Sequence, residues 1–308
     1  MKHLLYKNIV VDAGGELIPT VRIHPFNNDY LLTVDTDTNK AKSYLDFRFG
    51  SYVILPKGRN ALFEALSTYN LQTDDVVTIL TTSGNFYISG CVTREVDKIC
   101  KWNRQVTDKT KVIIFNHEFG YPCRNMNDVA KYGLPIIEDC AHTFYDNDPE
   151  IGKYSDFVVY SLPKAFPMQM GGILKKNKSI EIETESAVEK YVLTNLAIHI
   201  DKIGDYIEKR LNNFNYLQGE LSDLGIQPYF DDDKAIPGVF LFKWDETIDF
   251  PKLKEYMYLN GVECSVFYGQ NAFFIPVHQE LKKMSWTILL PCFSFIKSII
   301  MKNNYGFV

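Results

Sequence analysis

Two short segments hold residues that could do chemistry on an amine or on a ring nitrogen. Lys164 closely follows the apolar run 157–162, in the segment Ser161-Leu-Pro-Lys164. A lysine at a strand end can be partly desolvated, which lowers the pKa of its amine and makes it a usable nucleophile. Asp139 lies near the end of a second apolar run, 135–140, where a carboxylate can hold a proton on a ring nitrogen. Taken alone, Lys164 is more simply explained as a solvated surface lysine. Asp139 is explained equally well as a carboxylate that caps the next turn.

Two glycine segments could bring the backbone close to an anion. Gly58 directly precedes a helix that the spacing of apolar residues predicts over 59–70. The free N–H groups at such a helix start bind phosphate readily, although a plain helix start is the simpler explanation. Gly171 and Gly172, which begin seven residues beyond Lys164, would also allow a close backbone approach, or form an ordinary loop turn.

The elements that must position these residues are predicted as a largely parallel sheet. Five runs are nearly continuous in Val, Ile and Leu, as is typical of strands buried on both faces. A helix predicted within 125–133 connects two of them as a βαβ unit. In such sheets, ligands bind outside the carboxyl ends of the strands, which is where the Asp139 segment lies. The predicted strands are 76–82, 111–117, 135–140, 157–162 and 171–176.

The second half of the chain has a different pattern. Apolar residues keep helical spacing from Leu196 to Leu221, which predicts one long helix that joins two halves. A strand over 238–244, a helix over 251–260 and a strand over 262–267 follow. We therefore expect two domains, a large α/β domain over 1–185 and, over 186–308, the long helix with a smaller α/β domain.

Composition excludes several classes of protein. The 308 residues are 46% hydrophobic and 23% charged, which is ordinary globular composition, and the net charge of −5 lacks the basic excess of a nucleic-acid-binding protein. Six cysteines without a CxxC pair, and no histidine pair at ligand spacing, argue against a metal site and a disulfide scaffold and favour a reducing cytoplasm. Lys7 interrupts the N-terminal apolar run, and Pro291 and Lys297 interrupt the segment 288–301, so neither a signal peptide nor a membrane span is expected.

In this order, the segments resemble the DegT/DnrJ/EryC1/StrS family of sugar aminotransferases, which depend on pyridoxal phosphate and have fold type I. The family opens a helix with Ser-Gly-Thr-x-Ala-Leu, and this chain has Lys-Gly-Arg-Asn-Ala-Leu at 57–62. The family's Ile-Glu-Asp-Ala-Ala-Gln resembles Ile-Glu-Asp-Cys-Ala-His at 137–142. Its lysine with Gly-Gly seven residues further on matches Lys164 and Gly171-Gly172. Late family motifs, Pro-Leu-His and Leu-Pro, resemble Pro276-Val-His-Gln279 and Leu290-Pro291.

The resemblance implies a role for each matched residue. Lys164 corresponds to the lysine that carries the cofactor and moves the proton during transamination, and Asp139 to the carboxylate under the pyridinium nitrogen. His142 stands where the family has a glutamine near the ring hydroxyl. The other implied cofactor contacts are the phosphate turn of Gly58, Arg59 and Asn60, the phosphate-binding Ser161, and Phe86, which would stack on the ring or simply be a core residue.

The resemblance also implies a reaction. An amino group would move from an amino acid such as glutamate to a nucleotide-linked keto-deoxysugar, for a surface polysaccharide or a related product. The resemblance implies a homodimer; no nucleic-acid or membrane partner is expected. The family's Asn-Tyr-Arg-Leu is Lys190-Tyr-Val-Leu193 here, and the loop from Ser161 to Lys164 is two residues short and lacks the family's histidine. A pyridoxal phosphate enzyme of another reaction type and a non-catalytic homologue that acts as a binding protein therefore remain alternatives.

Overall fold

The computed structural model describes residues 10–11, 17–25, 36–282 and 285–294. Its contacts divide the chain into two compact units. The larger unit comprises residues 26–205 and 234–236, and the smaller unit comprises residues 1–25, 206–233 and 237–308. The sequence pattern predicts the boundary between the two domains at residue 185. The contacts place the boundary between the two units at residue 205 and add the first 25 residues to the smaller unit.

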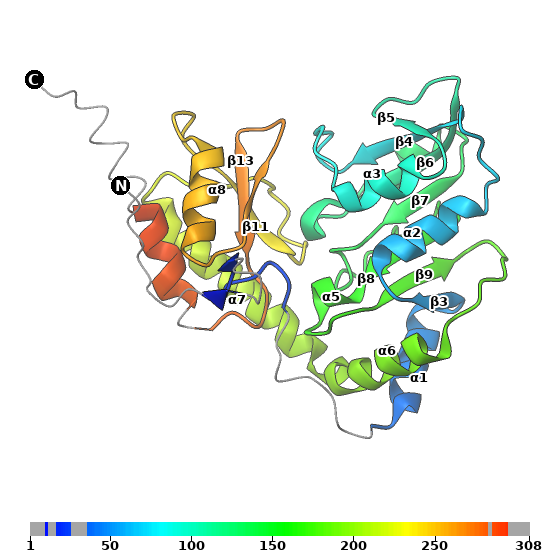
Figure 1. Cartoon of the computed structure of the whole chain (residues 1–308), viewed down its shortest axis with the longest axis horizontal. Coiled ribbons are helices and arrows are strands. Elements are labelled where there is room, and N and C mark those ends of the chain that lie inside the picture. The colour runs from blue at the N-terminus through cyan, green and yellow to red at the C-terminus, as the bar shows by residue number, and fades with distance from the viewer. Residues whose placement is uncertain (1–9, 12–16, 26–35, 283–284, 295–308) are drawn as a thin grey trace, which may run out of the picture. The chain divides into compact units, whose positions relative to one another are not determined.

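A seven-stranded sheet forms the centre of the larger unit (Figure 1). Four neighbouring pairs of its strands are parallel, and only β9 runs against its neighbours β3 and β8. The predicted, mainly parallel sheet is thus confirmed, and all five predicted runs are strands. In sheet order the strands are β3 (Tyr52–Leu55), β9 (Gly172–Lys176), β8 (Phe157–Ser161), β7 (Ile136–Asp139), β6 (Thr110–Asn116), β4 (Val76–Thr81) and β5 (Lys101–Asn103).

Helices cover this sheet through apolar faces that the sequence pattern specifies. The helix α2 (Gly58–Ser67) buries Ala61, Leu62, Ala65 and Leu66 in a cluster with residues of β3, β4, β6 and β8. This spacing of one and three residues puts four side chains on one helical face. The helices α1 (Thr38–Phe49) and α6 (Ser186–His199) pack together near β3. Three shorter helices lie in the connections: α3 (Gly90–Asp97), α4 (Met126–Ala130) and α5 (Leu162–Ala165).

The prediction of a single long helix from Leu196 onward is wrong in one respect. Helix α6 ends at His199, a 3-10 turn occupies Ile200–Lys202, and α7 runs from Ile203 to Ser222. A 3-10 turn has three residues per turn instead of 3.6, so it changes the phase of the buried face. His199 is buried and stacks on Phe166, whereas none of the three residues of the 3-10 turn is buried. Packing therefore interrupts a helix that the periodicity alone continues.

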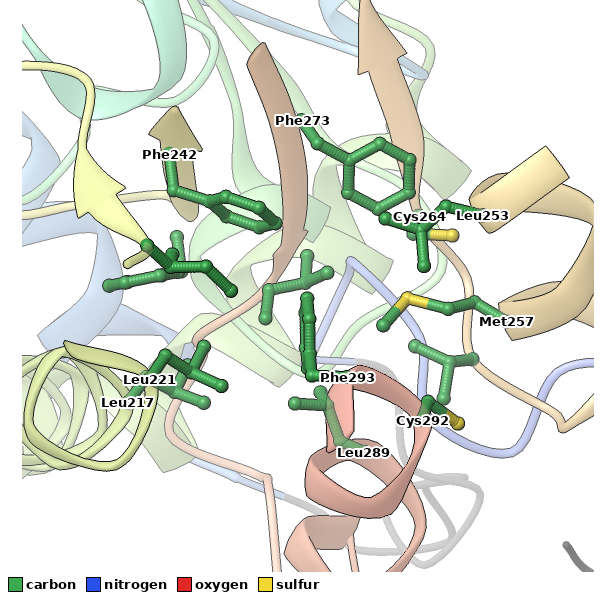
Figure 2. Close-up of a cluster of buried hydrophobic side chains, with 14 of the residues drawn as sticks. Leu217, Leu221, Phe242, Leu253, Met257, Cys264, Phe273, Leu289, Cys292 and Phe293 are labelled. Carbon is green, nitrogen blue, oxygen red and sulfur yellow. The ribbon is translucent and has the colours of Figure 1, made fainter. Parts of the chain in front are cut away.

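The smaller unit is built on an antiparallel sheet in the order β10, β11, β13, β12. Its strands are β10 (Gln227–Pro228), β11 (Val239–Lys243), β13 (Ala272–Pro276) and β12 (Ser265–Phe267). Helices α7, α8 (Phe250–Leu259) and 285–294 contribute Leu217, Leu253 and Phe293 to one core with the sheet (Figure 2). A two-stranded ribbon of β1 (Val10–Val11) and β2 (Leu17–Ile18) belongs to the same unit. Across the described ranges, we find no helix long and apolar enough to cross a membrane.

Candidate active site

Asp139 and Ser161, two residues of the predicted site, lie at one edge of the seven-stranded sheet together with two further polar residues. Thr81, Asn116 and Asp139 end the parallel strands β4, β6 and β7, and the register pairs Thr81 with Asn116 and Asn116 with Asp139. Ser161 ends the next parallel strand, β8. Because parallel strands share their direction, their carboxyl ends form a common edge, where ligands bind in open α/β sheets.

The carboxylate of Asp139 is held by hydrogen bonds on both oxygens. Asn116 Nδ2 donates to Oδ2 at 2.8 Å, and the backbone N–H of Ala141 donates to Oδ1 at 3.1 Å. The residue is only 5% exposed. These two donors fix the orientation of the carboxylate. Sequence reasoning missed Asn116, although a polar side chain at the end of the apolar run 111–117 was a usable signal.

Lys164 lies in α5, a single helical turn directly after β8, and is half-buried. Desolvation lowers the pKa of its amine, and the nearby Arg59 guanidinium lowers it further. The Asp139 carboxylate and the Cys91 sulfur act in the opposite direction and raise that pKa. The fold therefore brings Lys164 and Asp139 into one electrostatic environment and leaves the amine easier to deprotonate than an ordinary lysine.

The glycine segments meet at the start of α2. A Cβ on Gly172 would lie 2.4 Å from the carbonyl carbon of Lys57, and a Cβ on Gly58 would lie 3.0 Å from the Cβ of Ser161. The N–H of Gly171 donates to the carbonyl oxygen of Pro56 at 2.7 Å. The structure thus brings Gly58, Ser161 and Gly171-Gly172 together, with no room for a side chain at Gly172 and a tight contact at Gly58.

The first turn of α2 has neither a side-chain cap nor a carboxylate. Its N-cap, Lys57, makes no side-chain cap hydrogen bond, and the turn contains no acidic residue. Arg59 and Asn60 are exposed there. An uncapped helix start without a carboxylate has N–H groups and a positive dipole end available to an anionic ligand.

The two ring residues expected at the site have different surroundings. The ring of His142 lies 5.7 Å from that of Phe119, which lies 6.3 Å from that of Tyr87. Phe86 lies on the loop after β4 and is 78% exposed. The ring beside His142 is therefore that of Phe119, which stacks on Tyr87. Sequence reasoning identified neither, and the stacking role of Phe86 stays a prediction.

Buried Glu118 and partly buried Arg104 support the loop that carries Phe86. Glu118 Oε2 accepts a hydrogen bond from the N–H of Ser83 at 2.7 Å, and the guanidinium of Arg104 donates to the carbonyl oxygen of Asn85. Glu118 Oε1 is buried without a hydrogen-bond partner in the described structure. Desolvation raises the pKa of Glu118, although the hydrogen bonds from Ser83 and the charge of Arg104 oppose this shift. Sequence reasoning identified neither Glu118 nor Arg104.

A buried histidine lies next to the site without joining it. The N–H of Cys123 donates to Nδ1 of His117 at 3.0 Å, so Nδ1 carries a lone pair and Nε2 carries the proton. Nε2 then donates to Glu138 Oε2 at 2.9 Å. Ligand atoms of His117, Glu138 and Cys140 lie within 4.8 Å of one another, a grouping that could hold a metal ion. Because both ring nitrogens are engaged, hydrogen bonding accounts for the cluster.

The late motif around His278 lies in the smaller unit and has a structural explanation there. His278 is buried, and burial lowers its pKa to about 3, so the ring is neutral. The N–H of Glu280 donates to Nδ1 at 3.2 Å, and Nε2 donates to the carbonyl oxygen of Arg22 at 2.8 Å. Pro291 lies inside the helix 285–294.

Comparisons with known proteins agree with this architecture. Residues 96–189 match the sequence profile of the DegT/DnrJ/EryC1/StrS aminotransferase family. No curated protein matches the chain in sequence.

Several solved structures have the same fold at low sequence identity. Spr1654 of Streptococcus pneumoniae, assigned as a sugar aminotransferase, is 14% identical over 89% of this chain and 94% of its own, with a TM-score of 0.69. The aminotransferase TlmJ of Streptoalloteichus hindustanus is 12% identical over 86% of this chain and 92% of its own, with a TM-score of 0.68. A DegT DnrJ EryC1 StrS aminotransferase of Brucella abortus is 12% identical over 86% of this chain and 91% of its own, with a TM-score of 0.65. Residues 96–189 thus carry the sequence pattern of the DegT/DnrJ/EryC1/StrS aminotransferase family, and the chain has the fold of solved aminotransferases, which confirms the family resemblance found in the sequence.

Proposed function

We propose that this protein is a pyridoxal phosphate-dependent aminotransferase that moves an amino group from an amino acid to a keto sugar. The observation that carries the proposal is the placement of Lys164 and Asp139 after neighbouring strands, within electrostatic reach of each other and beside the uncapped start of α2. Spr1654 has been solved in forms with pyridoxal phosphate and with pyridoxamine phosphate, and NtdA of Bacillus subtilis with pyridoxamine phosphate. The family match supports the same cofactor here.

The residues present fit that cofactor. The close packing of Gly172 on Lys57 and of Gly58 on Ser161 forms a turn that any Cβ would fill, and its N–H groups suit a phosphate. Asp139, fixed by Asn116 and Ala141, supplies the negative charge that a protonated ring nitrogen needs. Lys164 supplies an amine that loses its proton readily. His142 and Phe86 remain proposed contacts to the ring, as do Asn60 and Ser161 to the phosphate.

The chain's own residues would share the work as follows. When bound, pyridoxal phosphate supplies an electron sink that stabilises negative charge on the carbon next to an amine nitrogen. Lys164 Nζ would hold the cofactor until the donor amine replaces it. The released lysine amine would then remove the proton from the carbon next to the donor's nitrogen and return a proton during the transfer. The lowered pKa of Lys164 keeps Nζ available as a base. Asp139 would hold a proton at the ring nitrogen throughout.

The finer details rest on the family resemblance. We propose glutamate as donor, a nucleotide-linked keto-deoxysugar as acceptor, a product for surface polysaccharide or related biosynthesis, and a homodimer. All six cysteines are free, which supports a cytoplasmic location because disulfides are rare in reducing compartments. The second candidate, a non-catalytic homologue, is favoured by Lys190 and Val192, which stand where the family has Asn and Arg.

A reduced covalent adduct tests the proposal directly. Purified protein is mixed with pyridoxal phosphate, its visible spectrum is recorded, and borohydride reduction is followed by peptide mapping. We expect the label on Lys164, no label there in Lys164→Ala, and an unchanged label in the matched variant Lys153→Ala, whose amine is paired with Glu150 at the surface. Glutamate should then shift the spectrum and a nucleotide-linked keto sugar should reverse that shift. A folded wild-type protein that takes up no cofactor would instead support the non-catalytic homologue.

A further inference from the structure

Arg59 stands where the family has a small threonine, and its side chain forms a cluster that the resemblance does not account for. Its Nη2 lies 3.3 Å from the Sγ of Cys91, 32 residues further along the chain, in the first turn of α3. The Arg59 guanidinium also lowers the pKa of Lys164, so the two residues lie within electrostatic reach of each other. The starts of α2 and α3, the guanidinium and the proposed cofactor lysine therefore share one neighbourhood.

This neighbourhood carries excess positive charge. Neither α2 nor α3 has an acidic residue in its first turn. Arg59 is cationic, and the one carboxylate that acts on Lys164, Asp139, already accepts hydrogen bonds on both oxygens. The uncapped start of α2 and a guanidinium that forms no ion pair with a described residue favour an anionic ligand such as a phosphate group.

The guanidinium is only weakly engaged within the protein. Among the described residues, its one hydrogen-bond partner is the thiol of Cys91, and sulfur is a weak acceptor. Arginine has five N–H donors in a planar fork that fits a phosphate, so most of them remain for a ligand. The thiol holds the side chain at the start of α2 without neutralising it.

We propose that the Arg59 guanidinium is a direct cationic ligand of the cofactor's phosphate, and that the bound phosphate covers the thiol of Cys91. The inference rests on the proposed function, because it concerns the same cofactor. It goes further, because it assigns recognition of the phosphate to a side chain rather than to backbone N–H groups alone. It also makes the exposed thiol of Cys91 a reporter of site occupancy.

The first experiment uses Cys91 in the wild-type protein. Cys91 is the exposed cysteine, and the other five are buried or partly buried. The rate of its alkylation by iodoacetamide is followed by peptide mass spectrometry without ligand, with pyridoxal phosphate and with pyridoxal, which has the same ring but no phosphate. At equal occupancy of Lys164, we expect the phosphorylated compound to slow alkylation on the order of 10-fold and pyridoxal to change it little. Equal rates with both compounds would overturn the inference.

The second experiment measures binding in Arg59 variants by spectroscopic titration. Loss of a charge-assisted hydrogen bond should weaken pyridoxal phosphate binding by on the order of 10- to 100-fold in Arg59→Met, with little change for pyridoxal. Arg59→Lys should recover part of this loss, because it keeps the charge but not the planar fork. Lys42→Met, which removes an exposed charge on α1, controls for net charge.

The two experiments separate this inference from the proposed function. If wild-type protein forms the Lys164 adduct but Arg59→Met keeps the wild-type preference for the phosphorylated compound, Arg59 is not a phosphate ligand and the proposed function stands. If wild-type protein forms no adduct with either compound, the proposed function itself fails. If Arg59→Met does not fold, two measurements still test whether Arg59 binds the phosphate. They are the affinity of Arg59→Lys for pyridoxal phosphate and the protection of Cys91 in the wild type.

Discussion

At the scale of single residues, the site depends on a carboxylate that cannot turn. Asp139 is almost completely buried, and the amide of Asn116 and the N–H of Ala141 occupy one oxygen each. Its charge also raises the pKa of Lys164, against the effect of desolvation. One side chain therefore serves two partners, the proposed ring nitrogen and the lysine amine.

The Asp139→Asn variant should remove the two effects of the Asp139 charge, on the ring nitrogen and on Lys164, while the protein still folds. Without the negative charge, the turnover number should fall by about 10²–10⁴-fold, the range for a lost proton-holding group. In the cofactor-free protein, the pKa of Lys164 should fall further, so competitive acylation of Nζ should begin at lower pH than in the wild type. Asp128→Asn, which breaks an exposed ion pair with Lys131, is the control and should change neither quantity. An unchanged acylation profile in Asp139→Asn would contradict the electrostatic link.

Glu118 predicts a pH dependence of stability. Its folded pKa is raised above the ordinary value of 4.5, so the folded state holds the proton more tightly than the unfolded state. Stability should therefore fall as the pH rises from about 4.5 through the folded pKa. Glu118→Gln does not titrate and can still accept from Ser83, so the free energy of unfolding of the variant relative to the wild type should be higher at pH 8 than at pH 5. Urea unfolding at both pH values measures this, and a constant difference would refute it.

At the scale of elements, the start of α2 depends on how closely two segments approach. Gly172 lies on β9, opposite Ser161 on β8, and its Cα faces the Lys57–Gly58 peptide. The peptide, the strand end and the helix start can meet only because no Cβ is present. The proposed phosphate turn is thus set by packing between three elements.

Gly172→Ala should damage this junction. A Cβ at 2.4 Å from a backbone carbon forces the strand and the helix apart, at a cost of about 1–3 kcal/mol in the free energy of unfolding, and cofactor binding should weaken in parallel. Gly204→Ala is the matched control, because no atom lies within 4 Å of a Cβ there. Gly204 lies in α7, where alanine should stabilise by roughly 0.5–1 kcal/mol. Chemical denaturation of both variants measures the change in the free energy of unfolding. Equal changes in Gly172→Ala and Gly204→Ala would contradict the proposed role of this junction.

At the scale of the whole molecule, the two units have separate hydrophobic cores. The candidate site lies entirely in the larger unit, whereas the core in Figure 2 belongs to the smaller one. In the smaller unit, Phe242 and Phe273 are fully buried on neighbouring strands, with ring centres 5.8 Å apart. The proposed chemistry and this aromatic core thus belong to different units.

Phe242→Ala should lower the free energy of unfolding of the smaller unit by about 3–5 kcal/mol, because it leaves a cavity in a close-packed core. Hydrogen exchange should show this loss among the amides of β11 and β13. Phe47→Ala is the control, since that ring on α1 is 93% exposed and its removal should change stability by less than about 0.5 kcal/mol. A large loss in Phe47→Ala would mean that this ring is covered in solution.

The sequence by itself determined the features that depend on local pattern. Continuous apolar runs predicted β4 and β6 to β9, and helical spacing predicted α2 and α8 within a few residues. The motifs around Asp139 and Lys164 carried the family resemblance. Such features can be predicted because the side-chain period of a helix or strand, and the position at which a strand ends, depend on residues that are neighbours in the sequence.

Only the tertiary structure decided which distant residues meet. Asn116 lies 23 residues from Asp139, and Arg59 lies 32 residues from Cys91, so strand register and helix packing bring each pair together. The 3-10 turn after His199 and the hydrogen bond of His278 to Arg22 likewise follow from burial among partners far away in the chain. No local period encodes such contacts, because they depend on the order and register of the strands across the whole sheet.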